Sequence, residues 1–143
     1  MADVDTLGNL LLRGFRWFDS ALLNALERQG FGEIRRPHSL IFAVLDQQGS
    51  ARISELARKL GITRQSAHQT VQELSDMGMV ELVADPSNAS ARLVVPTEQG
   101  KLSIRVARRR YAALERELAR RIGADAVASL RIALEKDWGE PPT

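Results

Sequence analysis

The chain has 143 residues, a net charge of +2 and no cysteine. This length suits one domain with its own hydrophobic core, and the missing cysteine excludes disulfides, thiolate metal sites and thiol-based redox sensing. No apolar run approaches the ~20 residues of a membrane-spanning helix, and no basic region precedes an apolar run as in a signal peptide. We therefore expect a soluble, cytoplasmic protein with no membrane partner.

Two helices are predicted at the start of the chain. Apolar residues recur at spacings of three and four over residues 7–29, which predicts a long amphipathic helix ending near Gly30. Pro37 fits the first turn of a second helix, because its missing N–H would have no partner there. The core face of that helix is formed by Leu40, Ile41, Val44 and Leu45.

Two short helices joined at Gly61 are predicted next. Ser54 is a favourable N-cap for the first of them, which Gly61 closes. Thr63 is expected to cap the second, which runs from Arg64 to about Met77. Gly78 then stands where a left-handed C-cap is typical.

A hairpin and two further helices complete the predicted order. Residues 80–83 and 92–95 predict short strands, and the connector DPSNASA between them is rich in turn residues. Thr97 is expected to cap a helix that ends near Ile122, and a last helix is expected from about Asp125 to Trp138. The fold class is therefore mainly α with a small β-hairpin wing, a winged helix-turn-helix.

The helix that begins at Arg64 has an unusual polar face. Ala67, Val71 and Leu74 fall within a narrow arc and are expected to face inward. The opposite side carries short hydrogen-bonding side chains, which can read base edges in the major groove. A polar helix face is often simply solvated, but the whole unit matches one DNA-docking geometry. We expect DNA contacts from Ser54, Thr63, Arg64, Gln65, Ser66, His68, Gln69, Gln72 and, on the wing, Arg92.

The stretches ISELARKLGITRQSAHQTVQELSDMGMVE and DPSNASARLVVPTEQG resemble the MarR (multiple antibiotic resistance regulator) family of winged helix-turn-helix transcription factors. Typical members have a Leu-Ala pair in the first of the two short helices, a Leu and a Gly before the wing, an Asp-Pro wing start and a Thr-x-x-Gly helix start. The corresponding residues here are Leu56-Ala57, Leu74, Gly78, Asp85-Pro86 and Thr97 to Gly100.

The wing departs from the family pattern. Family wings usually read Asp-Pro-x-Asp-Arg-Arg, and a wing-tip arginine normally enters the narrow minor groove. The last three positions of that pattern are Asn88, Ala89 and Ser90 here. Arg92 lies two residues later, either as a partial substitute or as an ordinary exposed strand arginine.

The resemblance implies a single domain over residues 1–143. In it, residues 37–97 form the DNA-binding lobe, and residues 5–30 and 101–138 form a helical dimerisation lobe. A two-fold homodimer would place two recognition helices ~34 Å apart on a near-palindromic site. The alternative is that the apolar faces of the terminal helices are buried within one chain.

The resemblance also implies a ligand-responsive regulator, more often a repressor. Family members often bind small aromatic ligands between the dimer helices and the DNA-binding lobe. On resemblance alone, the expected lining is Trp17, Phe18, His38 and Phe42. No cofactor or metal is expected, because His38 and His68 are the only histidines and cysteine is absent.

The charge distribution leaves a second function open. Residues 37–97 carry five basic and six acidic side chains, whereas residues 98–143 carry ten and seven. A near-neutral lobe without wing arginines would also suit a protein-interaction module with weak or no DNA binding. An enzyme is not expected, because no Gly-rich phosphate loop, metal-ligand spacing or nucleophile–base pair is present.

Overall fold

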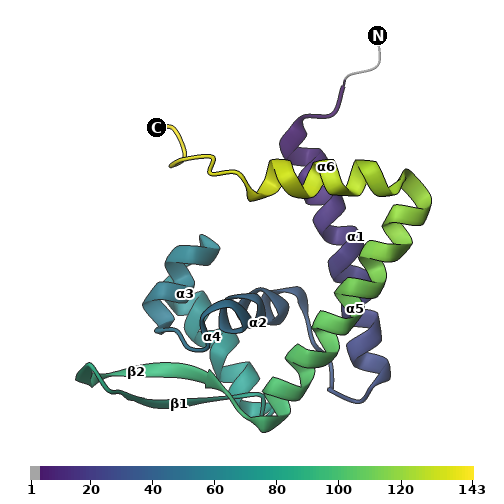
Figure 1. Cartoon of the computed structure of the whole chain (residues 1–143). Coiled ribbons are helices and arrows are strands. Elements are labelled where there is room, and N and C mark those ends of the chain that lie inside the picture. The colour runs from purple at the N-terminus through teal and green to yellow at the C-terminus, as the bar shows by residue number, and fades with distance from the viewer. Residues whose placement is uncertain (1–3) are drawn as a thin grey trace.

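The computed structural model describes residues 4–143, which contain six helices and one two-stranded antiparallel sheet (Figure 1). In chain order the elements are α1 (Leu7–Arg28), α2 (Arg36–Gln48), α3 (Ile53–Leu60), α4 (Arg64–Asp76), β1 (Val80–Asp85), β2 (Asn88–Pro96), α5 (Glu98–Ile122) and α6 (Ala124–Glu135). The predicted mainly α fold with a hairpin wing is confirmed. No helix among these residues is long and apolar enough to cross a bilayer.

The helix-turn-helix and the hairpin form one compact part of the molecule. Figure 1 shows α2, α3 and α4 grouped beside the hairpin, while α5 runs away from them alongside α1 and α6 crosses at the far end. Gly61 has a left-handed backbone with φ of 65° and ends α3, and Gly78 has φ of 75° after α4. Both conformations suit glycine, which explains why these elements end where the sequence predicts.

The start of α3 differs from the prediction. Ser54 is not its N-cap: the helix begins at Ile53, and the N-cap residue is Arg52, whose side chain makes no capping hydrogen bond. The reason is tertiary, because Ala51 forms a β-bridge with Val94 of β2. That bridge keeps the backbone extended up to Arg52, so that Ser54 lies inside the first turn.

The wing is longer than predicted and bulged. The two strands reach Asp85 and Asn88, so the turn is only Pro86-Ser87. Ala84 pairs with Arg92 while Asp85 pairs with Asn88, which leaves residues 89–91 without a partner on β1. Such a bulge bends the strand and turns the extra residues out of the ladder.

The last helix is shorter than predicted. It ends at Glu135 rather than Trp138, and Lys136 already has an extended backbone. The Trp138 indole Nε1 donates a hydrogen bond of 3.0 Å to the carbonyl of Ala133, so it satisfies one of the free carbonyls at the end of the helix.

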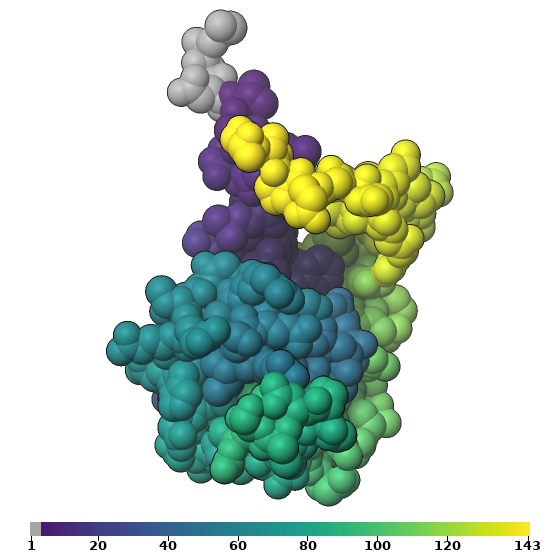
Figure 2. All heavy atoms as spheres, turned by 90° about the vertical axis from the view of Figure 1, so that its left-hand side faces the viewer, coloured from purple at the N-terminus to yellow at the C-terminus, as the bar shows by residue number. Residues whose placement is uncertain are grey.

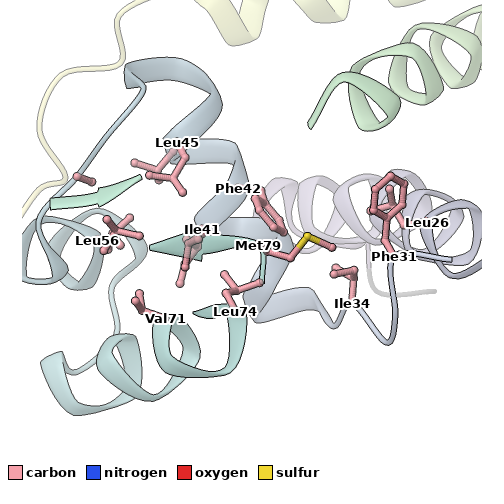
Figure 3. Close-up of a cluster of buried hydrophobic side chains, with 14 of the residues drawn as sticks. Leu26, Phe31, Ile34, Ile41, Phe42, Leu45, Leu56, Val71, Leu74 and Met79 are labelled. Atoms are coloured by element: carbon pink, nitrogen blue, oxygen red, sulfur yellow. The ribbon is translucent and has the colours of Figure 1, made fainter. Parts of the chain in front are cut away.

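One hydrophobic core joins α1 to the helix-turn-helix (Figure 3). Leu26 near the end of α1, together with Phe31 and Ile34 in the following loop, meets side chains from the other helices and from Met79. The contributing residues of α2, α3 and α4 are Ile41, Phe42, Val44, Leu45, Leu56, Val71 and Leu74. The C-terminal half of α1 therefore shares one core with α2, α3 and α4.

Large apolar side chains remain exposed on α1, α5 and α6. No residue of α6 is buried, and Trp138 is 63% exposed. The exposed residues on these elements are Leu7, Leu10, Leu12, Leu102, Ile122, Leu130, Ile132 and Leu134. Exposed apolar side chains, where they gather into a contiguous patch, are typical of an interaction surface.

Candidate nucleic-acid interface

The helix α4 is built so that its polar face points away from the core. Thr63 caps it, with Oγ1 accepting from the backbone N–H of Ser66 at 3.0 Å. Ala67, Val71 and Leu74 are at most 1% exposed, so the predicted inward arc is confirmed. The expected contact residues on the opposite face are all exposed: Arg64, Gln65, Ser66, His68, Gln69 and Gln72.

Within the described residues, 4–143, most side chains on this exposed face make no hydrogen bond. Gln72 is an exception, because its Nε2 donates to Asp76 Oδ1 at 3.0 Å. The side chain of Thr63 is also occupied by the helix cap. The exposed side chains of the first two turns, including those of Arg64, Gln65 and Gln69, make no such hydrogen bond within residues 4–143.

A hollow at the junction of α3, α4 and the wing brings together expected residues from three elements. Ser54, Arg64, His68 and Arg92 all line it, and so does Arg52. Figure 2 looks onto the face where the wing projects beside the helix-turn-helix. Three arginines around one concave site, with a single acidic partner at Asp85, favour an anionic ligand such as a phosphate backbone.

Arg52 is a residue that reading the sequence missed. Its guanidinium donates from Nε and Nη2 to Asp85 Oδ2, at 2.8 and 2.5 Å. The other oxygen of Asp85 accepts from the N–H and the hydroxyl of Ser87, at 2.9 and 2.8 Å. The Ser87 hydrogen bonds, followed by Arg52, lower the pKa of Asp85 from its ordinary value. No local pattern connects two residues 33 positions apart, so only the fold identifies this pair.

The tip of the wing carries no arginine. Asn88 Oδ1 accepts from the N–H and hydroxyl of Ser90, at 3.1 and 2.8 Å, which closes a small polar turn within the bulge. Arg92 pairs with Ala84, directly after the bulge, and lines the same hollow as Arg64. The basic groups of the wing region are therefore gathered beside α4 rather than at the tip.

A cavity of about 150 Å³ lies between α1, α2 and α5. Of the four residues expected to line a ligand pocket, Phe42 lines this cavity, whereas Trp17, Phe18 and His38 do not. Its lining is mostly apolar, with Asp46 and Arg108 paired across its edge at 2.8 Å. The further lining residues are Leu22, Leu26, Ser39, Ala43, Gln47, Ser103, Ile104, Ala107 and Tyr111.

The other three expected pocket residues have different surroundings. Trp17 and Phe18 are in edge-to-face contact at 5.0 Å between ring centroids, and Arg121 lies over the Trp17 ring at 5.7 Å. Phe18 also lines a separate groove against α5 and α6. His38 is 2% exposed and bonds to Glu73, 2.7 Å away on α4. Within residues 4–143, no group of three or more histidine or acidic side chains is placed to hold a metal ion.

Known proteins share part of this sequence and the fold of the chain. A sequence model described as the MarR family matches residues 34–89. The reduced form of MarR from E. coli superimposes with a TM-score of 0.79 at 22% identity, covering 96% of this chain and 99% of that chain. Wild-type apo MarR from E. coli gives 0.76 at 21% identity, covering 96% and 100%. At these identities the likeness establishes the fold.

A curated relative matches a shorter part of the chain. An uncharacterized protein of Mycobacterium tuberculosis (strain ATCC 25618 / H37Rv) is 27% identical over 84 residues. This match spans 59% of the present chain and 59% of the relative.

Proposed function

Because this chain is a winged helix-turn-helix protein of the MarR family, we propose that it is a homodimeric transcriptional regulator that binds a specific, near-palindromic DNA site. The observation that carries the proposal is the exposed hydrogen-bonding face of α4 beside the arginine-lined hollow. In this proposal Arg64, Gln65 and Gln69 read bases, and the hollow receives a phosphate.

DNA binding and dimerisation are proposed to be carried by two different parts of the fold. Residues 37–97 form the DNA-binding lobe, and residues 5–30 and 101–138 form the dimerisation lobe. The exposed apolar side chains of α1 and α6 support this division, because a second copy of the chain would remove them from water. Two-fold symmetry then places the two α4 helices one DNA turn apart.

We further propose that the regulator is a repressor whose DNA affinity a small apolar or aromatic effector changes. The cavity between α1, α2 and α5 supports this, because its walls come from both proposed lobes. A ligand that binds one lobe arrangement better than another shifts the population between them. Phe42 is the aromatic group on this cavity from the expected set.

The experiment that tests the proposal is fluorescence anisotropy of the protein with its own upstream DNA and with scrambled DNA, at two salt concentrations. Sequence-selective binding that weakens steeply with salt is expected, because released counterions dominate binding to DNA. Binding without sequence preference would contradict the proposal.

A second function has one observation in its favour. The arginine-free wing tip suits a module that docks on another protein instead of DNA. Apolar docking would change little with salt, so the same titration separates the two functions. Size-exclusion chromatography with light scattering tests the dimer directly, and a monomer would contradict the two-fold arrangement.

A further inference from the structure

One turn of helix holds two carboxylates that belong to different parts of the fold. The turn is residues 35–39, at the start of α2, and the carboxylates are Asp19 on α1 and Glu73 on α4. We call these residues together the α2 hub. No local motif marks the hub, because its two carboxylates are separated from the turn by many residues in both directions along the chain.

Asp19 is the carboxylate that α1 contributes to the hub. It is 0% exposed, although it is a carboxylate. Arg36 Nε donates to Asp19 Oδ2 at 2.7 Å, and the Ser39 hydroxyl donates to Asp19 Oδ1 at 2.7 Å. A buried charge is tolerated only when it is paired and hydrogen-bonded, so α1 and α2 must keep the arrangement that satisfies Asp19.

Glu73 is the carboxylate that α4 contributes to the hub. The ring of His38 accepts the backbone N–H of Arg35 at Nδ1, at 3.0 Å, so in its neutral form the proton must sit on Nε2. Nε2 then donates to Glu73 Oε2 at 2.7 Å, and the Arg35 guanidinium bonds to the same oxygen. The His38 hydrogen bond, with help from Arg35, lowers the pKa of Glu73 despite partial burial of that carboxyl.

The spacing within the turn explains how both contacts coexist. Arg35 and His38 are three residues apart and share one face, and Arg36 and Ser39 share the next. The face with Arg35 and His38 bonds to Glu73 of α4. The face with Arg36 and Ser39 bonds to Asp19 of α1. A small rotation of this turn would therefore disturb both carboxylates together.

We propose that Asp19, through the α2 hub, is a positioning residue that sets the direction of α4 relative to α1. This inference rests on the proposed function and deepens it. In a two-fold dimer, the distance between the two recognition helices depends on how each DNA-binding lobe is held against α1 and α5. The hub also borders the cavity between α1, α2 and α5, because Ser39 belongs to the hub and lines that cavity. An occupant of the cavity therefore lies against the contact that orients α4.

The first test measures half-site spacing with the Asp19→Asn variant. The wild-type protein selects its site from random DNA, and the two half-sites are then moved apart or together by one and two base pairs. Wild type should bind the native spacing best. In Asp19→Asn, the ratio of the affinities for native and altered spacing should fall about three- to tenfold. The discrimination between bases within a half-site should not change. An unchanged spacing preference would overturn the proposal.

The matched control is Glu117→Gln. Glu117 is also held by two donors, Arg120 and Arg121, but all three residues lie on α5. Neutralising it removes a bonded carboxylate without touching the contact between α1, α2 and α4. Its spacing preference should equal that of wild type, and an equal loss in both variants would overturn the specific role of Asp19.

A second measurement does not depend on DNA. The chain has no cysteine, so spin labels on Asn24→Cys in α1 and Gln69→Cys in α4 report one distance distribution when labelled protein is diluted with unlabelled protein. The distribution should be narrow in wild type and clearly broader with Asp19→Asn. Ser39→Ala removes only one hydrogen bond to Asp19, so it tests the hub if Asp19→Asn does not fold.

The two measurements separate failure of the inference from failure of the proposed function. If wild type selects no DNA site, the proposed function fails, and the label distances still decide whether the hub positions α4. Equal distance distributions in wild type, in Ser39→Ala and in any folded Asp19→Asn protein would overturn the positioning role. A broader distribution in the hub variants, but not in Glu117→Gln, would support it.

Discussion

Arg52, the residue before α3, is bonded to Asp85 at the end of β1 through two hydrogen bonds of 2.8 and 2.5 Å. This pair connects the N-terminal end of α3 to the last residue of β1, next to the turn of the wing. Asp85 is 7% exposed and also accepts two hydrogen bonds from Ser87. The Arg52–Asp85 pair, supported by Ser87, therefore holds the end of β1 against the residue that precedes α3.

Wing attachment should depend on pH through Asp85. Its folded-state pKa is lowered from an ordinary value of 3.8, so its stabilising contribution is complete above that value and is lost as the pH falls through the folded pKa. Asp85→Asn should lower the Tm at neutral pH, and the difference from wild type should shrink below pH 3.8. Thermal unfolding followed by circular dichroism across this range measures it. A difference that is constant with pH would contradict the assignment.

Base reading by α4 should fail when Arg64→Ala and Gln69→Ala are combined. Both residues are exposed, so the fold and the Tm should be unchanged. A good bidentate contact contributes about 1–3 kcal/mol of discrimination, so the preference for the selected site over scrambled DNA should fall at least about tenfold. Competition anisotropy measures this ratio.

The matched control for this pair is Arg109→Ala with Gln99→Ala. These are the same residue types, and both are exposed on α5. The control should keep the full preference for the selected site. Loss of preference in both double variants would point to net charge rather than to the face of α4.

An arginine added to the wing should strengthen DNA binding. Ala89 is exposed in the bulge at residues 89–91, outside the pairing with β1. Ala89→Arg should tighten binding by about 1 kcal/mol at low salt, or roughly fivefold in Kd. Ala128→Arg, on the exposed side of α6, adds the same charge far from the wing and should have a smaller effect. Equal Kd values for Ala89→Arg and wild type would mean that the wing does not approach DNA.

The start of α5 depends on a close approach that only glycine allows. A Cβ on Gly100 would lie 2.0 Å from the carbonyl oxygen of Met79, which itself accepts the backbone N–H of Thr97 at 3.0 Å. Because the obstacle is backbone, Gly100→Ala should destabilise the protein by about 1–3 kcal/mol, the range for an overpacked core. Urea unfolding measures the change in the free energy of unfolding.

Gly14→Ala is the matched control for that substitution. A Cβ on Gly14, in the middle of α1, meets no atom within 4 Å. It should therefore stabilise the protein by about 0.5–1 kcal/mol, since glycine is unfavourable inside a helix. Destabilisation of similar size in both variants would contradict the steric explanation.

The sequence by itself determined the order of the elements and the inward face of α4. Both follow from interactions within a few residues: apolar periodicity, the caps at Thr63 and Thr97, and the positive φ at Gly61 and Gly78. The helix bounds it predicted agree with the structure to within a few residues for the same reason. Exposure of the polar face of α4 then follows directly from the burial of Val71 and Leu74.

Only the tertiary structure decided how these elements are joined. The start of α3 depends on the bridge between Ala51 and Val94, and Arg52 holds the end of β1 through Asp85. His38, which the family resemblance placed in a ligand pocket, is instead buried and bonded to Glu73. These partners are 33 to 43 residues apart, and no local spacing specifies such a pair, because the contact forms only after the chain has packed its core.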